Sequence, residues 1–188
     1  CDILLSDDGL QHHALGRDIE LVVVDGERAF GNQRCLPAGP LREPLSRLAS
    51  VDAVISNGVI DCSRLPVESH CMKLTPVHWR HLIDDVRYPA HQLPFSGQVH
   101  ALAGIGNPQR FFRTLTNLGV EHLPRPLADH HRFTPTDLRF SDNLPVVMTA
   151  KDAVKCRSFA NERCWALDVE ARPDQALVDW LAKRLEAL

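Results

Sequence analysis

Two adjacent carboxylates near the start of the chain have the type and spacing that metal or phosphate chemistry requires. Asp7 and Asp8 follow the apolar run 3–5 and lead into Gln11 and His12. Carboxylates at the end of a buried strand repel one another, and a hard cation such as Mg²⁺ relieves that repulsion by taking one or both as oxygen ligands. The alternative is a solvated turn in which one aspartate caps a following helix.

A second candidate is a stiff loop that carries Arg42 and Glu43. The string LPAGPLREP at residues 36–44 contains three prolines, and each fixes a backbone angle, so the loop is suited to hold both side chains in one pose. Arginine pairs with phosphate through two hydrogen bonds, and glutamate suits Mg²⁺. An exposed ion pair of little energetic value is the alternative interpretation.

Short apolar runs predict the strands that would hold these loops. The runs cover residues 2–6, 19–25, 51–57, 99–103, 145–149 and 165–169. Continuous runs of this kind are typical of strands buried on both faces of a parallel sheet, and helical patterns between them predict an α/β fold. Between these strand-rich parts, prolines spaced among alternating residues predict a linker built as an extended hairpin.

Helix signals support this organisation in the second half of the chain. Asn107 and Pro108 predict a helix start and Gly119 its end, while Thr134 and Asp137 have the spacing of a capping box. The last segment is predicted to be an amphipathic helix, with apolar residues at helical spacing: Leu177, Trp180, Leu181, Leu185 and Leu188.

Composition excludes several classes of protein. The chain has 188 residues, 44% hydrophobic and 24% charged, with a formal net charge of -3, so neither disorder nor a bulk positive field for nucleic acid is indicated. Six cysteines without a CxxC pair indicate reduced thiols rather than a disulfide framework or zinc site. A dinucleotide-binding GxGxxG motif starting at Gly104 fails at Gln109, and no HExxH zinc motif occurs.

An ordered set of strings resembles the tetraacyldisaccharide 4'-kinase family. They are DDGLQHH, VVVDGERAFGN, LPAGPLREP, ALAGIGNPQRFF, LADHHRF and VVMTAKDAVKC, and they cover nearly the whole chain. Each string is weak alone, but the ordered set is specific. Ala150 departs from the family's pattern, where we expect glutamate.

The resemblance implies a P-loop kinase variant that moves the γ-phosphate of ATP, with Mg²⁺, to the 4'-hydroxyl of a lipid A disaccharide precursor. It implies part of a P-loop-type parallel-sheet lobe at residues 1–66, a two-stranded β linker at 67–98 and a second, smaller α/β lobe at 99–188. No GxxxxGK[ST] string occurs among the 188 residues, so we expect this chain to be incomplete as a catalyst.

The resemblance also implies roles for named residues of the first lobe. Asp7 and Asp8 would be the catalytic acidic pair near Mg²⁺ and the phosphates, with Gln11 and His12 completing that signature. Arg42 would face phosphate, and Glu43 would complete the metal environment.

In the second lobe, His130 matches the family histidine that works with an acid to activate the sugar hydroxyl. A histidine paired with a carboxylate is a sensible general base near neutral pH. The adjacent His131 is the alternative match.

The family further implies ATP and a lipid A precursor as partners, no nucleic acid, and peripheral contact with the cytoplasmic face of the bacterial inner membrane through a segment outside this chain. A non-catalytic nucleotide-sensing or assembly module of the same fold is the alternative function.

Overall fold

A computed structural model describes residues 2–58 and 65–188, and the fold is mixed α/β with a mainly parallel sheet. The chain divides into two compact units: unit 1 comprises Cys1–Leu74 and Ala171–Leu188, and unit 2 comprises Thr75–Glu170. Among the described residues the strand order is β1-β2-β3-β8-β7-β5-β6, with β4 paired to β3. The strands β3 (Glu68–His81) and β8 (Cys164–Pro173) each contain a boundary between the units.

Unit 1 is built on parallel strands with long loops between them. β1 (Leu21–Asp25) pairs with β2 (Ala53–Asn57), and β2 pairs with the first residues of β3. The loop between β1 and β2 contains the 3-10 helix η1 (Leu45–Ser50). The unit ends in α3 (Gln175–Glu186), which confirms the predicted C-terminal helix and is capped by Asp174.

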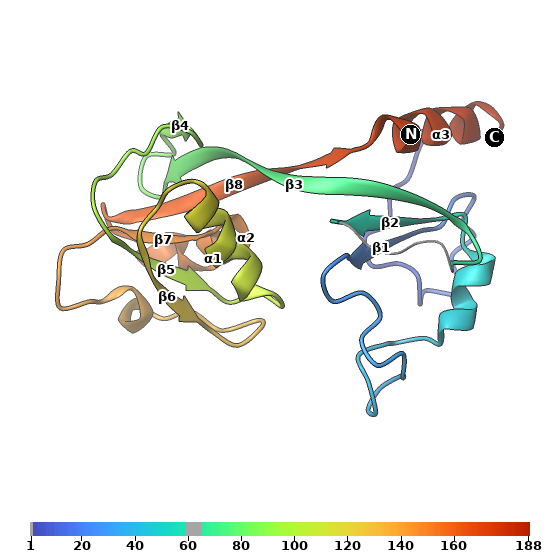
Figure 1. Cartoon of the computed structure of the whole chain (residues 1–188), viewed down its shortest axis with the longest axis horizontal. Helices are drawn as coiled ribbons and strands as arrows, with labels where there is room; N and C mark the ends of the chain where they lie inside the picture. The colour runs from blue at the N-terminus through green and yellow to red at the C-terminus, as the bar shows by residue number, and fades with distance from the viewer. Residues whose placement is uncertain (1, 59–64) are drawn as a thin grey trace. The chain divides into compact units, whose positions relative to one another are not determined.

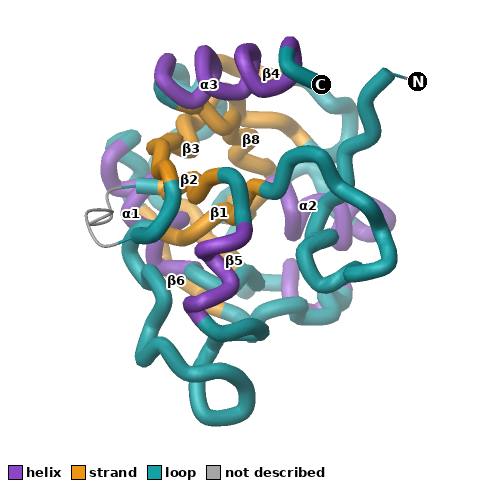
Figure 2. The backbone as a smooth tube through the Cα atoms, turned by 90° about the vertical axis from the view of Figure 1, so that its right-hand side faces the viewer, coloured by secondary structure: helices purple, strands orange, loops and turns teal. Residues whose placement is uncertain are grey.

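The prediction of a strand at residues 2–6 is wrong. This segment forms no strand, and Figure 2 draws it as loop, with Ile3, Leu4 and Leu5 exposed by 56%, 79% and 90%. A buried strand needs hydrogen-bonded neighbours. Within the described residues β1 pairs with β2 and ends the strand order, and no strand pairs with residues 2–6.

Unit 2 is an open parallel sheet. β5 (Val99–Ala103) lies between β6 (His122–Pro126) and β7 (Val146–Thr149), and β7 pairs with β8, all in parallel. The end of β3 forms an antiparallel hairpin with β4 (Arg87–Pro89). The helices are α1 (Pro108–Asn117) and α2 (Ala150–Cys156), with the short 3-10 helices η2 (Pro135–Leu138) and η3 (Arg157–Phe159).

The two helices of unit 2 cover opposite faces of its sheet, as Figures 1 and 2 show. On one face, α1 packs Phe112 and Leu115 against alternate residues of β5 such as Ala101. On the other, α2 packs against Leu102 and Met148. Side chains alternate along a strand, so buried β5 supplies both cores.

The division into units differs from the lobes that we expected at residues 1–66, 67–98 and 99–188. The last helix belongs to unit 1, because β8 returns the chain there and Asp174 bonds to Cys71: its carboxylate accepts from the Cys71 amide at 2.8 Å and its own amide donates to the Cys71 carbonyl at 2.9 Å.

None of the helices within residues 2–58 and 65–188 has both the length and the hydropathy needed to cross a bilayer.

Candidate functional site

A cavity of about 1300 Å³ in unit 1 is lined by the segment before β1 and by the loop between β1 and β2. Most of the residues that the sequence predicted for phosphate and metal chemistry line it: Asp7, Asp8, Gln11, Arg42 and Glu43. The sequence placed the acidic pair at the end of a strand, whereas the structure holds it in irregular backbone, with Asp8 in the left-handed region at φ 53°. His12 is exposed and contributes its backbone rather than its ring.

Arg42 joins the two predicted loops. Its guanidinium donates to both carboxylate oxygens of Asp8, at 3.0 Å from Nη1, and also to the Gln11 side-chain oxygen. The Gln11 amide in turn donates to Glu43 Oε1 at 2.6 Å. The Asp8 and Arg42 side chains are 70% and 50% exposed, so their pairing contributes little to stability and leaves both groups open to a charged ligand.

The carboxylates of this cavity do not by themselves form a metal site. Among the described residues no group of three histidine, cysteine, aspartate or glutamate side chains is arranged to hold an ion. Asp8 faces Arg42, and Glu43 faces Gln11 and Arg47. Mg²⁺ commonly takes one or two carboxylates and completes its shell with phosphate oxygens and water. The carboxylate of Asp7 or Asp8 could bind Mg²⁺ in this way. The described residues do not form a set of protein ligands that would enclose the ion.

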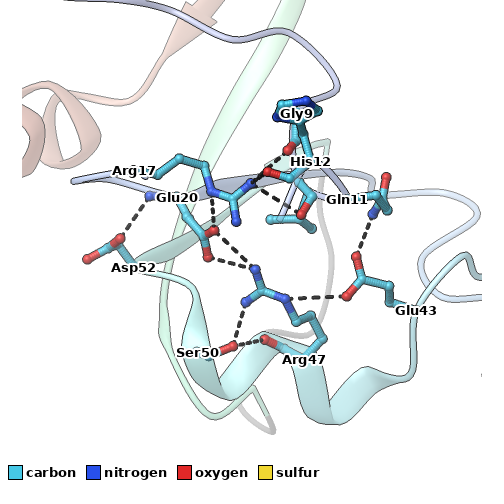
Figure 3. A network of polar contacts seen from close by, with 10 residues as sticks. Gly9, Gln11, His12, Arg17, Glu20, Glu43, Arg47, Ser50 and Asp52 are labelled. Atoms are coloured by element: carbon cyan, nitrogen blue, oxygen red, sulfur yellow. Dashed lines mark hydrogen bonds and ion pairs between the residues drawn. The ribbon is translucent and has the colours of Figure 1, made fainter. Parts of the chain in front are cut away.

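A set of charged residues that the sequence analysis did not single out contacts these loops (Figure 3). They are Arg17, Glu20 and Arg47. Glu20 accepts from Arg17 at 2.6 Å and from Arg47 at 2.8 Å. Arg17 also donates to the carbonyl oxygens of Gly9 and His12, at 2.8 and 3.2 Å. In the sequence, Arg17 and Glu20 appear only as charges directly before an apolar run, a pattern that ordinarily indicates a solvent-exposed strand start.

In unit 2, candidate residues gather at the carboxyl edge of the sheet. Gly104 follows β5, the turn at residues 128–131 follows β6, and Thr149 ends β7. Because β5→α1→β6 and β7→α2→β8 proceed to opposite sides, this edge is a topological switch point, where open α/β sheets bind ligands. His130 sits here in the left-handed region at φ 58°, with its side chain 78% exposed. Its ring nitrogen Nε2 lies 3.9 Å from Asp129.

The neighbouring His131 has a different environment. Its Nε2 lies 3.3 Å from Asp137 Oδ2, its side chain is 29% exposed, and its ring packs edge-on against Phe133 at 5.1 Å. The same Asp137 oxygen accepts from the Thr134 amide and hydroxyl, which confirms the predicted capping box on the short helix η2. Burial raises the pKa of Asp137, but the bonds from Thr134 and His131 outweigh burial and hold that pKa below its usual range. His131 is thus anchored to its own unit, whereas His130 is presented to solvent.

A fully buried carboxylate fixes the backbone beside this turn. Asp152 accepts from the Gly104 amide, the Thr149 hydroxyl and the Lys155 ammonium, each at 2.9 Å. A Cβ on Gly104 would meet Asp152 and His131 atoms at 3.3 Å, so glycine permits their close approach. The sequence left Asp152 without a role, because its partner Gly104 lies far away along the chain.

These features define a class: an α/β protein in which the irregular loops of unit 1 expose aspartate and arginine at a cavity, and in which the sheet edge of unit 2 exposes a histidine. The family is shown by sequence. The model of the tetraacyldisaccharide-1-P 4'-kinase family matches residues 1–186, and the chain belongs to that family.

Curated relatives agree with this assignment, and a solved structure shares the fold. Tetraacyldisaccharide 4'-kinases of Ectopseudomonas mendocina and Azotobacter vinelandii are each 51% identical over 187 residues, and that of Pseudomonas aeruginosa is 50% identical. LpxK from Aquifex aeolicus, crystallised in complex with ATP, shares the fold with a TM-score of 0.67 at 24% identity, covering 95% of this chain and 56% of that one. The alignments cover all of this chain but 55% of each of these curated relatives, so the chain spans about half their length.

Proposed function

We propose that this chain forms part of an enzyme that transfers the γ-phosphate of ATP to the 4'-hydroxyl of tetraacyldisaccharide 1-phosphate, a step in lipid A biosynthesis. The observation that carries the proposal is the family match over residues 1–186, together with the gathering of Asp8, Gln11, Arg42 and Glu43 at one cavity. ATP is the phosphate donor, and the acceptor is a lipid at the cytoplasmic face of the inner membrane.

Each site residue has a role that its environment permits. Arg42 is half exposed and presents a planar fork that matches phosphate oxygens. Gln11 and Glu43 hold one another and keep the two loops together around the phosphates. Mg²⁺, when bound with ATP, would neutralise phosphate charge, and Asp7 or Asp8 would supply its protein ligand.

His130 is the general base in this proposal. Its ring is open to solvent beside Asp129, and it sits at the carboxyl edge of the unit 2 sheet. A neutral imidazole there accepts the proton of the attacking hydroxyl, and the nearby carboxylate stabilises the imidazolium that results. His131 is less suited, because one ring nitrogen is already engaged with Asp137.

The test measures phosphate transfer from labelled ATP to the disaccharide lipid. The chain is assayed alone and as a chimera in which it replaces the matched region of the P. aeruginosa relative. We expect the chimera to be active and Asp8→Asn and His130→Ala to lower its kcat by about 100-fold or more. His91→Ala, which removes an exposed histidine elsewhere in unit 2, is the matched control and should leave kcat unchanged.

Two outcomes contradict the proposal. Full activity in both site variants would remove the assigned roles. ATP binding without any transfer by the chimera would favour the alternative, a nucleotide-sensing or assembly module.

A further inference from the structure

A network of charged contacts connects the two loops of the unit 1 cavity through the Glu20 carboxylate. Its members are Arg17, Glu20, Arg47 and Glu43. The loop that carries Asp8 and Gln11 has no regular secondary structure, and neither do the residues around Arg42. Loops of this kind hold a pose only if side chains tie them to a rigid element. The question is which residue does so here.

Glu20 is itself held firmly at the sheet. Its amide donates to Asp52 Oδ2 at 2.8 Å, and its carbonyl accepts from the Asp52 amide at 2.9 Å. Glu20 directly precedes β1 and Asp52 directly precedes β2, so these bonds extend the β1–β2 pairing by one residue. The side chain of Glu20 therefore starts from backbone that is hydrogen-bonded to the residue directly before β2.

From that position the Glu20 carboxylate accepts from two arginines that lead to different loops (Figure 3). Arg17 continues to the carbonyl oxygens of the turn at residues 9–12. Arg47, on η1, continues to Glu43 through its Nε at 3.3 Å. Both predicted site loops are thus linked to the sheet through the same carboxylate.

The charges of this chain of contacts balance. Arg17, Glu20 and Arg47 are 18%, 13% and 19% exposed, and Glu43 is 20% exposed, so two cations and two anions share one partly buried cluster. Removing one member of such a cluster is costly, because its partners stay buried with unpaired charge. Without the Glu20 charge, the guanidinium group of Arg17 would lose this carboxylate partner and that of Arg47 would keep only Glu43.

We propose that Glu20 is a positioning residue: through Arg17 and Arg47 it sets the turn at residues 8–12 and the Arg42–Glu43 loop relative to each other. Glu20 lines the same cavity, and in this proposal it acts through the two arginines. The inference rests on the proposed function only in taking these loops to bind ATP phosphates. The contacts alone show that both loops are linked to Glu20, in addition to the direct bonds between Arg42 and Asp8 and between Gln11 and Glu43.

The test compares Glu20→Gln, Glu20→Asp and a control, Glu186→Gln, in the 188-residue chain. Glu186 is an exposed residue at the end of α3, so its substitution removes the same charge from unit 1 outside the network. Amide hydrogen exchange is followed in peptides covering residues 8–13 and 41–44, with the buried strand β2 of the same unit as internal reference. Binding of Mg²⁺–ATP is measured by calorimetry on the same variants in the chimera with the P. aeruginosa relative.

Glu20→Gln should speed exchange in both loop peptides by about tenfold or more while exchange in β2 is unchanged. It should also weaken Mg²⁺–ATP binding by about tenfold, and Glu20→Asp, which keeps the charge, should restore much of both. Glu186→Gln should change neither measurement.

The positioning role is overturned if the two loop peptides exchange as in the wild type, or if β2 and the loops speed up equally, which would indicate general destabilisation of unit 1. Lack of ATP binding by the chimera with the wild-type sequence of this chain would count against the proposed donor site. The exchange pattern would still decide the role of Glu20, so the two failures are distinguishable.

Discussion

Asp152 is a fully buried carboxylate of unit 2 whose removal the structure makes costly. We expect Asp152→Ala to lower the free energy of unfolding of this unit by about 2–4 kcal/mol. The Gly104 amide is the main reason: it is buried, and its loss of an acceptor costs about 1–3 kcal/mol. Lys155 is 28% exposed and can turn to water, so its lost ion pair adds only about 0.5–1 kcal/mol.

Two matched variants separate the contributions. Asp152→Asn keeps a side-chain oxygen for the Gly104 amide and loses the charge, so we expect it to cost about 1–2 kcal/mol. Lys155→Met leaves the buried carboxylate with the Gly104 and Thr149 hydrogen bonds but without its cation, so it should cost less than Asp152→Ala. Asp152→Ala should be the most costly of the three variants, because it alone leaves the buried Gly104 amide without an acceptor.

The assay is urea unfolding followed by tryptophan fluorescence. Trp79 and Trp165 report on unit 2, while Trp180 lies in unit 1, so a Trp180→Phe background isolates the unit of interest. Because two units can unfold separately, circular dichroism of the same samples identifies each transition. An Asp152→Asn variant as unstable as Asp152→Ala would refute the reasoning, since it would make the charge, not the acceptor, responsible.

Two further predictions concern titratable groups. Burial raises the pKa of Cys156 to about 12 and also raises that of Cys164, so at pH 8 Ellman's reagent should label exposed Cys71 and reach the other two only after unfolding; native labelling of Cys156 as fast as that of Cys71 would contradict this. The hydrogen bond from His100 lowers the pKa of Asp142, so the pair stabilises the fold fully above the ordinary aspartate pKa and loses this contribution as pH falls through the lower folded value. Asp142→Asn should therefore flatten the acid limb of the stability profile below about pH 4, and an unchanged acid limb would show that the pair is not responsible.

Local signals predicted several elements of unit 2, although β6 and α2 were not among the elements predicted from the sequence. Asn107 accepts from the Arg110 amide and Pro108 opens α1, as their types indicate, and Gly119 adopts φ 75° just after the helix. These signals need only residues a few positions apart. The strand at 99–103 was predicted to its end residues because it is buried on both faces and its apolar run is unbroken.

Unit 1 shows where sequence signals fail. The run at residues 3–5 has the composition of a buried strand, yet strand formation depends on a neighbour that hydrogen-bonds to it, and composition does not reveal that neighbour. Similarly, the parallel pairing of β2 with β3 joins what we expected to be a lobe and a linker. The strand that pairs with a given strand can lie far away along the chain. The alternation of apolar and polar residues therefore predicted only the hairpin that the end of β3 forms with β4.

The site loops show the same difference between local and long-range information. Type and spacing identified Asp8, Gln11, Arg42 and Glu43, because the sequence gives the chemistry of each side chain directly. What orients them was not identified, because Glu20 and its arginines look like ordinary surface charges until the fold brings the β1 and β2 starts together. The turn at residues 8–12 lacks helix and strand, and the Arg42–Glu43 segment has only the short 3-10 helix η1 beside it, so we infer that charged side chains anchored at the sheet position both. Residues of that kind are recognisable only from structure, and their loss should disturb both loops at once.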